Sequence, residues 1–347
     1  MRAVVFTEFG GPRHLHTVEV PEPAPHGAVI EVRATGVCRS DWHGWQGHDP
    51  DVRLPHVPGH EFAGVVAAVG HEVTQWRPGD RVTVPFVCAC GTCDACDSGD
   101  HQVCENQTQP GFTHQGSFAE FVRIDHADVN LVRLPDDLDF VPAAALGCRF
   151  ATAFRAVQAH GQVQSGHWVA VHGCGGVGLS AVMIATALGA RVIAVDVSHA
   201  ALALAREMGA VATVDAREVT DIGARVVELT DGGAHVSIDA FGSEAACAAS
   251  IESLRRRGRH VQVGLLPEKL GRPRVPMARV VWLELSLHGS HGMAAHEYGP
   301  MLQMVADGTL RPDRLVSDVI GLDDAPAALT AMSGPTSPGT RVIVPGL

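Results

Sequence analysis

The chain has very little lysine and tyrosine. Among 347 residues there is one lysine, Lys269, and one tyrosine, Tyr298. A P-loop or Schiff-base lysine would have to be Lys269, which stands in Leu-Pro-Glu-Lys-Leu without a glycine-rich phosphate loop. The residue four places after Tyr298 is Leu302, so the Tyr-x-x-x-Lys pair of short-chain reductases is also excluded.

Long apolar runs and long basic runs are missing as well. No unbroken apolar stretch reaches about 18 residues, and the N-terminus has no apolar run of signal-peptide length, so we expect a cytoplasmic protein without a membrane partner. The net charge is −12, and the longest basic run is Arg255-Arg256-Arg257, which we interpret as the solvated end of a helix before Gly258. This balance predicts no nucleic-acid partner.

The pattern of apolar residues changes along the chain. The length suits two domains. Short β-branched runs between turn formers predict a barrel-like β domain in the first third, with strands at 28–34, 64–70 and 81–85. Beyond about residue 143, strand-like runs alternate with helical ones, which predicts a doubly wound parallel sheet. We expect its strands at 168–171, 191–196, 212–214, 236–239, 260–264 and 285–289, and its helices at 177–188, 200–208, 244–254 and 278–283. A helix at 301–305 and a strand at 341–344 would return to the first domain.

A glycine-rich motif, Gly173-Cys174-Gly175-Gly176-Val177-Gly178, follows the first of these strands and opens a helix. The next strand ends in Asp196, eighteen residues after Gly178. Strand, glycines, helix N-terminus and acid together form the dinucleotide fingerprint, in which the acid binds the adenosine ribose hydroxyls. An acid at this position repels a 2′-phosphate, and the following Val197-Ser198-His199 has no arginine to neutralise one, so the motif favours NAD over NADP.

Cysteine is more abundant than lysine or tyrosine: the chain has nine cysteines, and four of these are clustered. In a reducing compartment, clustered cysteines are metal ligands more often than disulfides. Four thiolates in one short loop complete a tetrahedral zinc shell with no open position, which is the structural kind of zinc site. The cluster consists of Cys90, Cys93, Cys96 and Cys104, and Cys88 is interpreted as a spectator.

Further candidate zinc ligands stand at three separate places, Cys38, His60 and Cys148. A Cys₂His set leaves a fourth zinc position for water or substrate. Sequence spacing cannot join these places, and each residue taken singly fits an ordinary buried or turn position.

Taken together and in this order, the motifs resemble those of the zinc-dependent medium-chain alcohol dehydrogenases over essentially the whole chain. The quoted motifs are Gly36-Val-Cys38-Arg-Ser-Asp41, Pro58-Gly-His60-Glu61-Phe-Ala-Gly64, the four-cysteine cluster, Leu146-Gly-Cys148 and the glycine motif. The resemblance implies an α/β protein: a GroES-like β-barrel catalytic domain at 1–150 with a C-terminal return at 291–347, and a Rossmann domain at 151–290. The active site would lie in the cleft between them.

The resemblance also implies a role for individual residues. Glu61 would be an acid beside the catalytic zinc, Asp41 would orient the ligand histidine, and Ser40 and His43 would relay the proton. Two zinc ions per chain are implied, a catalytic one on Cys38, His60 and Cys148 and a structural one on Cys90, Cys93, Cys96 and Cys104. The implied NAD contacts are Arg39, Thr152, Gly173, Gly175, Gly176, Val177, Gly178, Asp196, Val263 and Arg341.

The predicted activity is that of an NAD-dependent zinc alcohol dehydrogenase, within EC 1.1.1 and most narrowly EC 1.1.1.1. It would reversibly oxidise a primary or secondary alcohol by hydride transfer from a zinc-bound alkoxide. Polyol dehydrogenases of the family tend to carry glutamate where this chain has Cys148, which favours a simple alcohol or aldehyde. An aldehyde or ketone reductase of the same family is the first alternative, and a non-enzymatic zinc-ribbon binding protein is a remote one. A homo-oligomer is implied, tetramer or dimer.

Overall fold

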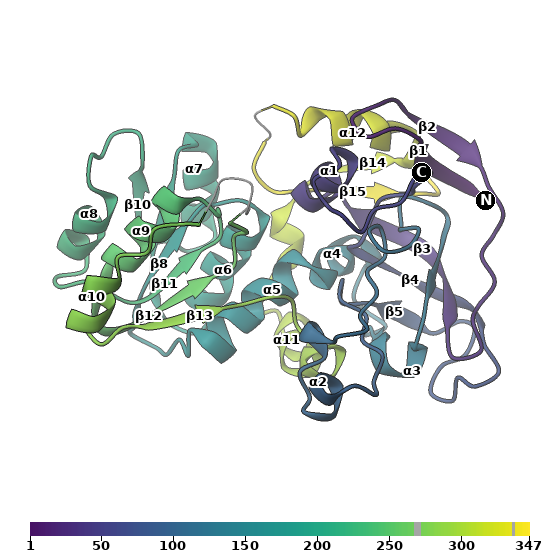
Figure 1. Cartoon of the computed structure of the whole chain (residues 1–347), viewed down its shortest axis with the longest axis horizontal. Coiled ribbons are helices and arrows are strands. Elements are labelled where there is room, and N and C mark those ends of the chain that lie inside the picture. Colours follow the sequence, from purple (N-terminus) through teal and green to yellow (C-terminus); the bar gives the residue numbers. More distant parts are fainter. Residues whose placement is uncertain (267–271, 335–336) are drawn as a thin grey trace. The chain divides into compact units, whose positions relative to one another are not determined.

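The chain divides into two compact units (Figure 1). The computed structural model describes residues 1–266, 272–334 and 337–347, so Lys269 lies outside the described residues. The first unit contains Met1–Ala151 and the C-terminal segments that begin at Gly292 and Thr340, and the second contains Thr152–His291 and the short segment Ser337–Gly339.

The first unit is built on a seven-stranded sheet that is mostly antiparallel. Its centre is β3 (Ala28–Gly36), which pairs with β4 (Phe62–Val69), β6 (Phe121–Ile124) and β15 (Thr340–Val344). The outer strands are β5 (Arg81–Thr83), β7 (Val132–Arg133) and β14 (Val316–Gly321), and a separate hairpin joins β1 (Arg2–Phe6) and β2 (Arg13–Thr17). The predicted β-rich first domain is confirmed.

Alternation along β3 explains how this sheet makes a core. Ala28, Ile30 and Val32 are buried together with Phe62 and Val66 of β4. Side chains at every second position of a strand share one face, so β-branched residues at these positions cover the barrel interior. The ends of β3 and β4 are thereby held at fixed positions, and the residues just beyond those ends carry the candidate metal ligands.

The second unit is a six-stranded parallel sheet in the order β10-β9-β8-β11-β12-β13. Helices α6 and α7 contact each other, and α8 and α9 contact each other. Because parallel crossovers are right-handed, the two pairs cover opposite faces of the sheet, which is the predicted doubly wound arrangement. The strands are β8 (Trp168–His172), β9 (Arg191–Asp196), β10 (Ala212–Asp215), β11 (Ala234–Asp239), β12 (Leu254–Gln262) and β13 (Ser286–Gly289). The helices are α6 (Gly176–Ala187), α7 (His199–Glu207), α8 (Ile222–Leu229) and α9 (Glu244–Glu252).

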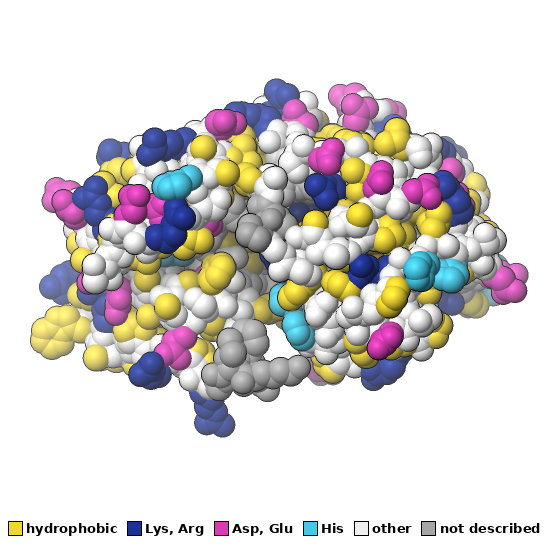
Figure 2. Space-filling view, turned by 90° about the horizontal axis from the view of Figure 1, so that it is seen from above, with side chains coloured by type: hydrophobic (Ala, Val, Ile, Leu, Met, Phe, Trp, Pro, Cys, Tyr) yellow, Lys and Arg dark blue, Asp and Glu magenta, His cyan; other side chains and the backbone are white. Residues whose placement is uncertain are grey.

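One local prediction in this unit is wrong. Helix α9 ends at Glu252, and Arg255-Arg256-Arg257 belongs to β12 and not to a helix end. The register passes from Ala234 opposite Leu254 to Val236 opposite Arg259, so the arginines form an exposed irregularity in a strand. On the face seen in Figure 2, basic side chains are interspersed with acidic ones.

Helix α8 and the β1–β2 hairpin were not anticipated. A signal for α8 was present, because Asp221 caps the helix and accepts a hydrogen bond from the Ala224 backbone N–H at 2.8 Å. The remaining helices are α1 (Arg39–Trp45), α2 (Asp94–Asp97), α3 (Ala127–Asn130), α4 (Phe140–Ala144), α5 (Arg149–Arg155), α10 (Met277–Trp282), α11 (Tyr298–Ala306) and α12 (Ala325–Ala331). Within the described ranges, no single helix is long and apolar enough to cross a membrane, although the bent pair Phe140–Gly147 and Arg149–His160 passes that test when its halves are joined.

Candidate metal centres and cofactor loop

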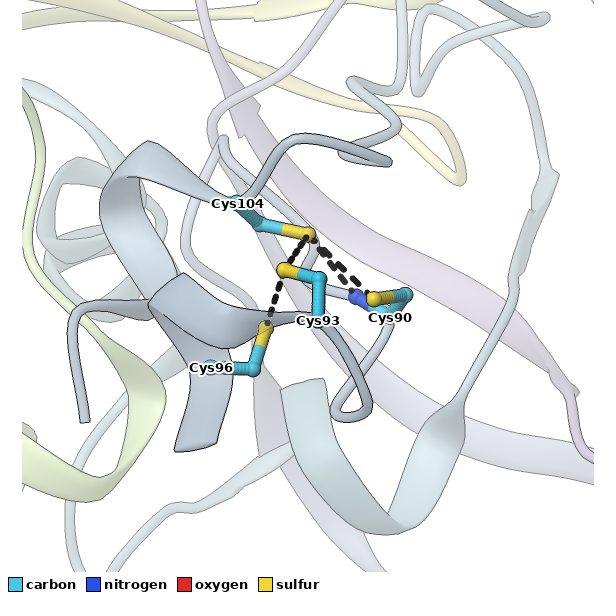
Figure 3. A group of neighbouring side chains, drawn as sticks. All are labelled: Cys90, Cys93, Cys96 and Cys104. Atoms are coloured by element: carbon cyan, nitrogen blue, oxygen red, sulfur yellow. Dashed lines mark hydrogen bonds between the residues drawn. The ribbon is translucent and has the colours of Figure 1, made fainter. Parts of the chain in front are cut away.

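The four clustered cysteines converge on one point (Figure 3). Sγ–Sγ distances are 3.5 Å for Cys93–Cys96, 3.7 Å for Cys93–Cys104 and 3.5 Å for Cys104–Cys90. A disulfide needs about 2.05 Å, whereas four sulfurs around one zinc at about 2.3 Å lie roughly 3.8 Å apart. The donor set therefore fits a tetrahedral zinc ion.

The loop also stabilises thiolate charge. The Thr92 backbone N–H and hydroxyl both donate to Cys90 Sγ, and these bonds lower the pKa of Cys90 to about 5. Cys88 is outside the cluster; it is buried in the first unit's core, and burial raises the pKa of its thiol. The cluster thus contains four cysteines and not five.

Cys38, His60 and Cys148 come from three separate segments and meet in the first unit. Cys38 precedes α1, His60 precedes β4 and Cys148 precedes α5, and their ligand atoms all lie within 4.8 Å of one another. The Nε2 atom of His60 is buried and has no hydrogen-bond partner. Since buried polar atoms are nearly always paired, an unpaired nitrogen facing two sulfurs fits a zinc ligand.

The two thiols differ in acidity. A hydrogen bond with Cys148 lowers the pKa of Cys38 well below its usual value, while the same bond and burial raise the pKa of Cys148. Two thiolates and a neutral imidazole together suit a dication, and binding it releases the remaining protons.

Asp41 fixes the orientation of His60. Its Oδ1 accepts from His60 Nδ1 at 2.8 Å and from the Gly59 N–H at 3.0 Å, and its Oδ2 accepts from the Cys38 N–H at 2.9 Å. Burial would lower the pKa of His60, but the Asp41 carboxylate raises it well above the usual value. Asp41 holds the proton on Nδ1, so Nε2 is the nitrogen that would release its proton and bind the metal.

Glu61 is held by an arginine that the sequence reasoning missed. Arg149 Nε donates to both Glu61 oxygens, at 3.1 and 2.8 Å, and Arg149 Nη2 and backbone N–H add further bonds. Burial opposes charge on Arg149, but Glu61 outweighs it and raises the pKa of the guanidinium. A Cβ on Gly36 would lie 2.7 Å from Glu61 Oε2 and 2.8 Å from Arg149 Nη2, so only glycine fits over this pair.

Two further groups around the site were also missed. The hydroxyl of Tyr298 is fully buried and donates to the carbonyl oxygens of Leu146 and Gly147, at 3.3 and 3.4 Å, directly before Cys148. The rings of Phe112 and Phe86 lie 5.1 and 6.3 Å from the His60 ring. Tyr298 steadies the ligand segment, and the two phenylalanines give the site an apolar wall.

Ser40 and His43 lie one turn apart on α1. Ser40 Oγ is 3.9 Å from Cys38 Sγ, next to the ligand set. His43 Nδ1 lies 2.9 Å from Nδ1 of His48, which the sequence reasoning also missed. Burial, together with His48 and Arg39, lowers the pKa of His43. The side chains of His43 and His48 are exposed, so this imidazole pair faces solvent.

The glycine motif turns between β8 and α6 as the fingerprint requires. Gly173 has φ +90°, and a Cβ on Gly178 would lie 1.8 Å from the Gly173 carbonyl oxygen. A Cβ on Gly175, the N-cap of α6, meets nothing within 4 Å, so the backbone there is open to a ligand. Gly176 and Val177 begin the helix, whose N-terminus suits a pyrophosphate.

Asp196 stands beside this motif at the end of β9. Its Oδ2 accepts from the Cys174 N–H at 2.6 Å, and its Oδ1 accepts from the Ser198 N–H at 2.8 Å. Two backbone bonds hold the carboxylate in one orientation while each oxygen keeps a further lone pair for a ribose hydroxyl. The residues present therefore fit a dinucleotide.

The other expected cofactor contacts have different surroundings. Arg39 donates to the Met332 carbonyl oxygen, and Arg341 on β15 lies 3.3 Å from Asp318 of β14. Thr152 is buried in α5, and the Val263 N–H donates to the Asp239 carbonyl oxygen at 2.9 Å. A pyrophosphate role for either arginine remains a prediction.

Helix α1, which follows Cys38, carries two tryptophans, Trp42 and Trp45, and both have partners elsewhere in the first unit. Trp45 packs in a core cluster with Phe6 and Phe112, and Trp42 Nε1 donates to Ser333 Oγ at 2.9 Å.

Comparisons with known proteins agree with this geometry. Residues 24–136 match the alcohol dehydrogenase GroES-like domain, and residues 176–307 match the zinc-binding dehydrogenase domain. The chain is 35% identical over 313 residues to an alcohol dehydrogenase of Geobacillus stearothermophilus, covering 90% of each chain.

Two solved structures have the same fold. The alcohol dehydrogenase TADH from Thermus sp. ATN1 gives a TM-score of 0.90 at 33% identity, over 99% of both chains. A proposed zinc-binding dehydrogenase from Sinorhizobium meliloti 1021, bound to NADP, gives 0.88 at 29% identity, also over 99% of both chains. An oxidoreductase that uses zinc and a nicotinamide cofactor accounts for the donor sets, the glycine motif and these relatives together. The chain belongs to the zinc-dependent medium-chain alcohol dehydrogenase family.

Proposed function

We propose that the protein oxidises a primary or secondary alcohol with NAD and runs the reverse reduction. The observation that carries the proposal is the convergence of Cys38, His60 and Cys148, with an unpaired imidazole nitrogen, in a chain that also has the dinucleotide motif. Three protein ligands leave a fourth zinc position for the substrate oxygen.

The chain's own residues would position the substrate and move its proton. When bound, zinc supplies Lewis acidity at the substrate oxygen, and the nicotinamide exchanges hydride with the adjacent carbon. Ser40 Oγ, beside Cys38, would accept the substrate's hydroxyl proton while giving up its own proton towards His43, so that the serine stays neutral. His43, neutral at pH 7 because its pKa is lowered, receives that proton and passes it to His48 and solvent.

The site favours a simple, largely apolar substrate. Phe86 and Phe112 pack around His60, and Cys148 replaces the glutamate typical of polyol dehydrogenases in the family. An aldehyde or ketone reductase is the second candidate, because the same zinc set polarises a carbonyl oxygen.

NAD is the proposed cofactor because Asp196 stands, held by two backbone bonds, at the position that binds the ribose hydroxyls. An Asp196→Gly variant should weaken NAD more than NADP. Equal loss of both cofactors would contradict this role.

Zinc content tests the assignment of both metal sites. We expect two zinc ions per chain in the wild-type protein and about one in Cys148→Ala, which should have no measurable turnover. Cys247→Ala is the matched control, since Cys247 is buried in the second unit's core and is in no ligand group. A Cys148→Ala protein that keeps two zinc ions or normal activity would contradict the catalytic site.

A substrate panel tests the reaction class. Primary, secondary, aromatic and polyol alcohols would be compared by NADH absorbance, with the matching aldehydes and ketones in reverse. Turnover of polyols alone would refute the proposed substrate class.

We also propose that the protein is a homo-oligomer. Strand β13 is an edge of the parallel sheet. It and α10, the helix before it in the chain, expose the apolar side chains of Met277, Val281, Trp282 and Leu287, and Trp282 is 79% exposed. Unpaired edges next to apolar surface favour association. Light scattering should show a dimer or tetramer that Trp282→Glu weakens, and a monomeric wild-type protein would refute this.

A further inference from the structure

A second acid lies beside Asp196 at the edge of the parallel sheet. Asp215 ends β10 and stands opposite Asp196 in the register of β10 with β9. The next residue, Ala216, donates its N–H to the Asp196 carbonyl oxygen at 3.0 Å. Because the carboxyl ends of parallel strands are where dinucleotides bind, Asp215 and its partners belong to the surroundings of the adenosine ribose.

Asp215 holds the nearby cationic groups. Arg217 Nε lies 3.1 Å from Oδ1 and Nη2 lies 2.7 Å from Oδ2, and the Arg217 N–H donates to Oδ1 at 2.9 Å. His199 Nδ1 lies 3.3 Å from Oδ2. The Asp215 side chain is 6% exposed and that of Arg217 is 54% exposed, so a buried acid holds an accessible guanidinium.

The electrostatics agree with this geometry. Hydrogen bonds from Arg217 lower the pKa of Asp215 to about 2, and the same bonds raise the pKa of Arg217. The Asp196 carboxylate also raises the pKa of Arg217, so the guanidinium is attracted by the charges of both acids. His199, Asp215 and Glu218 could also surround a cation, but the fork of Arg217 already occupies both Asp215 oxygens.

A guanidinium is the group that recognises a phosphate best, because its fork donates two parallel hydrogen bonds. An arginine near the adenosine ribose is also how related folds accommodate the 2′-phosphate of NADP. In this chain Arg217 lies near the expected adenosine ribose, but its guanidinium is paired with the Asp215 carboxylate.

We propose that Asp215 is a second determinant of cofactor choice, which withholds Arg217 and His199 from a 2′-phosphate. The inference rests on the NAD preference proposed above and deepens it. Asp196 disfavours the phosphate by direct repulsion, whereas Asp215 acts through the groups it holds.

The expected effect can be measured without turnover. In Asp215→Asn the residue keeps its shape but loses its charge, so Arg217 is free to pair with a 2′-phosphate. We expect the affinity for 2′,5′-ADP to rise about tenfold, a modest gain because Arg217 is half-exposed and solvent screens its pairing with the phosphate. The affinity for 5′-ADP should stay within about twofold.

Two variants separate this mechanism from a general change in charge. Asp215→Asn combined with Arg217→Gln should lose the gain, because the released guanidinium is gone. Asp313→Asn is the matched control: Asp313 forms the same two-bond pair with Arg311, two residues away in sequence, in the other unit. It should change neither affinity.

Calorimetric titration of the full-length protein with 2′,5′-ADP and 5′-ADP, at 50 and 500 mM salt, gives the test. A tenfold gain that falls at high salt and disappears in the double variant supports the proposal. An unchanged affinity ratio in folded Asp215→Asn, or a gain that survives in the double variant, overturns it. Tighter binding of 2′,5′-ADP than 5′-ADP by the wild-type protein would refute the NAD preference, which is a separate outcome.

Discussion

Replacing Asp41 by asparagine tests how the catalytic ligand set is held. The carboxylate accepts three hydrogen bonds, from Cys38 N–H, Gly59 N–H and His60 Nδ1. An asparagine oxygen can keep the last two, but its NH₂ group then faces the Cys38 N–H, donor against donor. The substitution therefore leaves the Cys38 N–H unpaired, and rotating the amide leaves both the Gly59 N–H and the His60 Nδ1–H unpaired.

An unpaired buried donor costs about 1–3 kcal/mol. Loss of a carboxylate that supports a metal-bound imidazole costs about 10–100-fold in metal affinity, and that range corresponds to about 1.4–2.8 kcal/mol. The two estimates agree. We therefore expect Asp41→Asn to bind its catalytic zinc about 10–100-fold more weakly, with the four-cysteine site unchanged.

The assay is competition with a chelator, followed by elemental analysis of the protein. One zinc per chain should leave Asp41→Asn at a chelator concentration about 10–100-fold lower than for the wild type. Asp128→Asn is the matched control, because Asp128 also accepts three hydrogen bonds, from Thr74 and Gln75, outside both ligand sets. Equal zinc retention in Asp41→Asn and wild type would refute the reasoning.

Four other outcomes follow from the same geometry. Cys96→Ser should remove the zinc of the four-cysteine site and lower the melting temperature, since a tetrahedral shell needs four ligands. Elemental analysis and calorimetry check it. Tyr298→Phe should destabilise the protein by about 0.5–1.5 kcal/mol in denaturant unfolding without loss of zinc, because one buried hydroxyl is lost. Burial lowers the pKa of His172 to about 3. Below about pH 6.5 this histidine is protonated in the unfolded chain but stays neutral in the folded one, so the free energy of unfolding should fall by about 2 kcal/mol towards pH 5. In His172→Leu the free energy of unfolding should fall less over the same pH range. Alcohol oxidation should decline only below about pH 6.5, because His43 must be neutral to accept the proton and its pKa is lowered; a pH profile of His43→Gln should lack this limb.

The sequence predicts best what depends on short spacing. The four clustered cysteines lie within fifteen residues, and the glycine motif joins a strand directly to a helix, so chain geometry alone brings their atoms together. The parallel sheet was predicted from strand-like and helical apolar runs that alternate along the chain, and each such run is also a local feature of the sequence. Helix α8 was also signalled locally, by the Asp221 cap.

The groups that support the site could not be read in this way. Arg149 follows Cys148 in sequence, but its partner Glu61 is 88 residues away. Tyr298 reaches Leu146 across 152 residues. Such pairs depend on how distant segments pack, and no local pattern encodes them. The arginine triplet illustrates the converse, since a helix-end pattern was overridden by strand pairing.

Arginine and histidine supply nearly all the side-chain cations of this chain, and this composition bears on the pH dependence of its activity. Glu61 and Asp215, the acids held beside the metal set and the cofactor edge, are both paired with arginine. Arginine stays protonated throughout the range in which proteins are folded, so the cationic partner in each pair keeps its charge. With one lysine and twenty histidines in the chain, the side-chain cations that titrate between about pH 5 and 8 are imidazoles. His43 lies on the proposed proton path, so the acid limb of activity should follow its protonation. Replacing the arginine partner of Glu61 or Asp215 should change affinity and stability more than the pH profile.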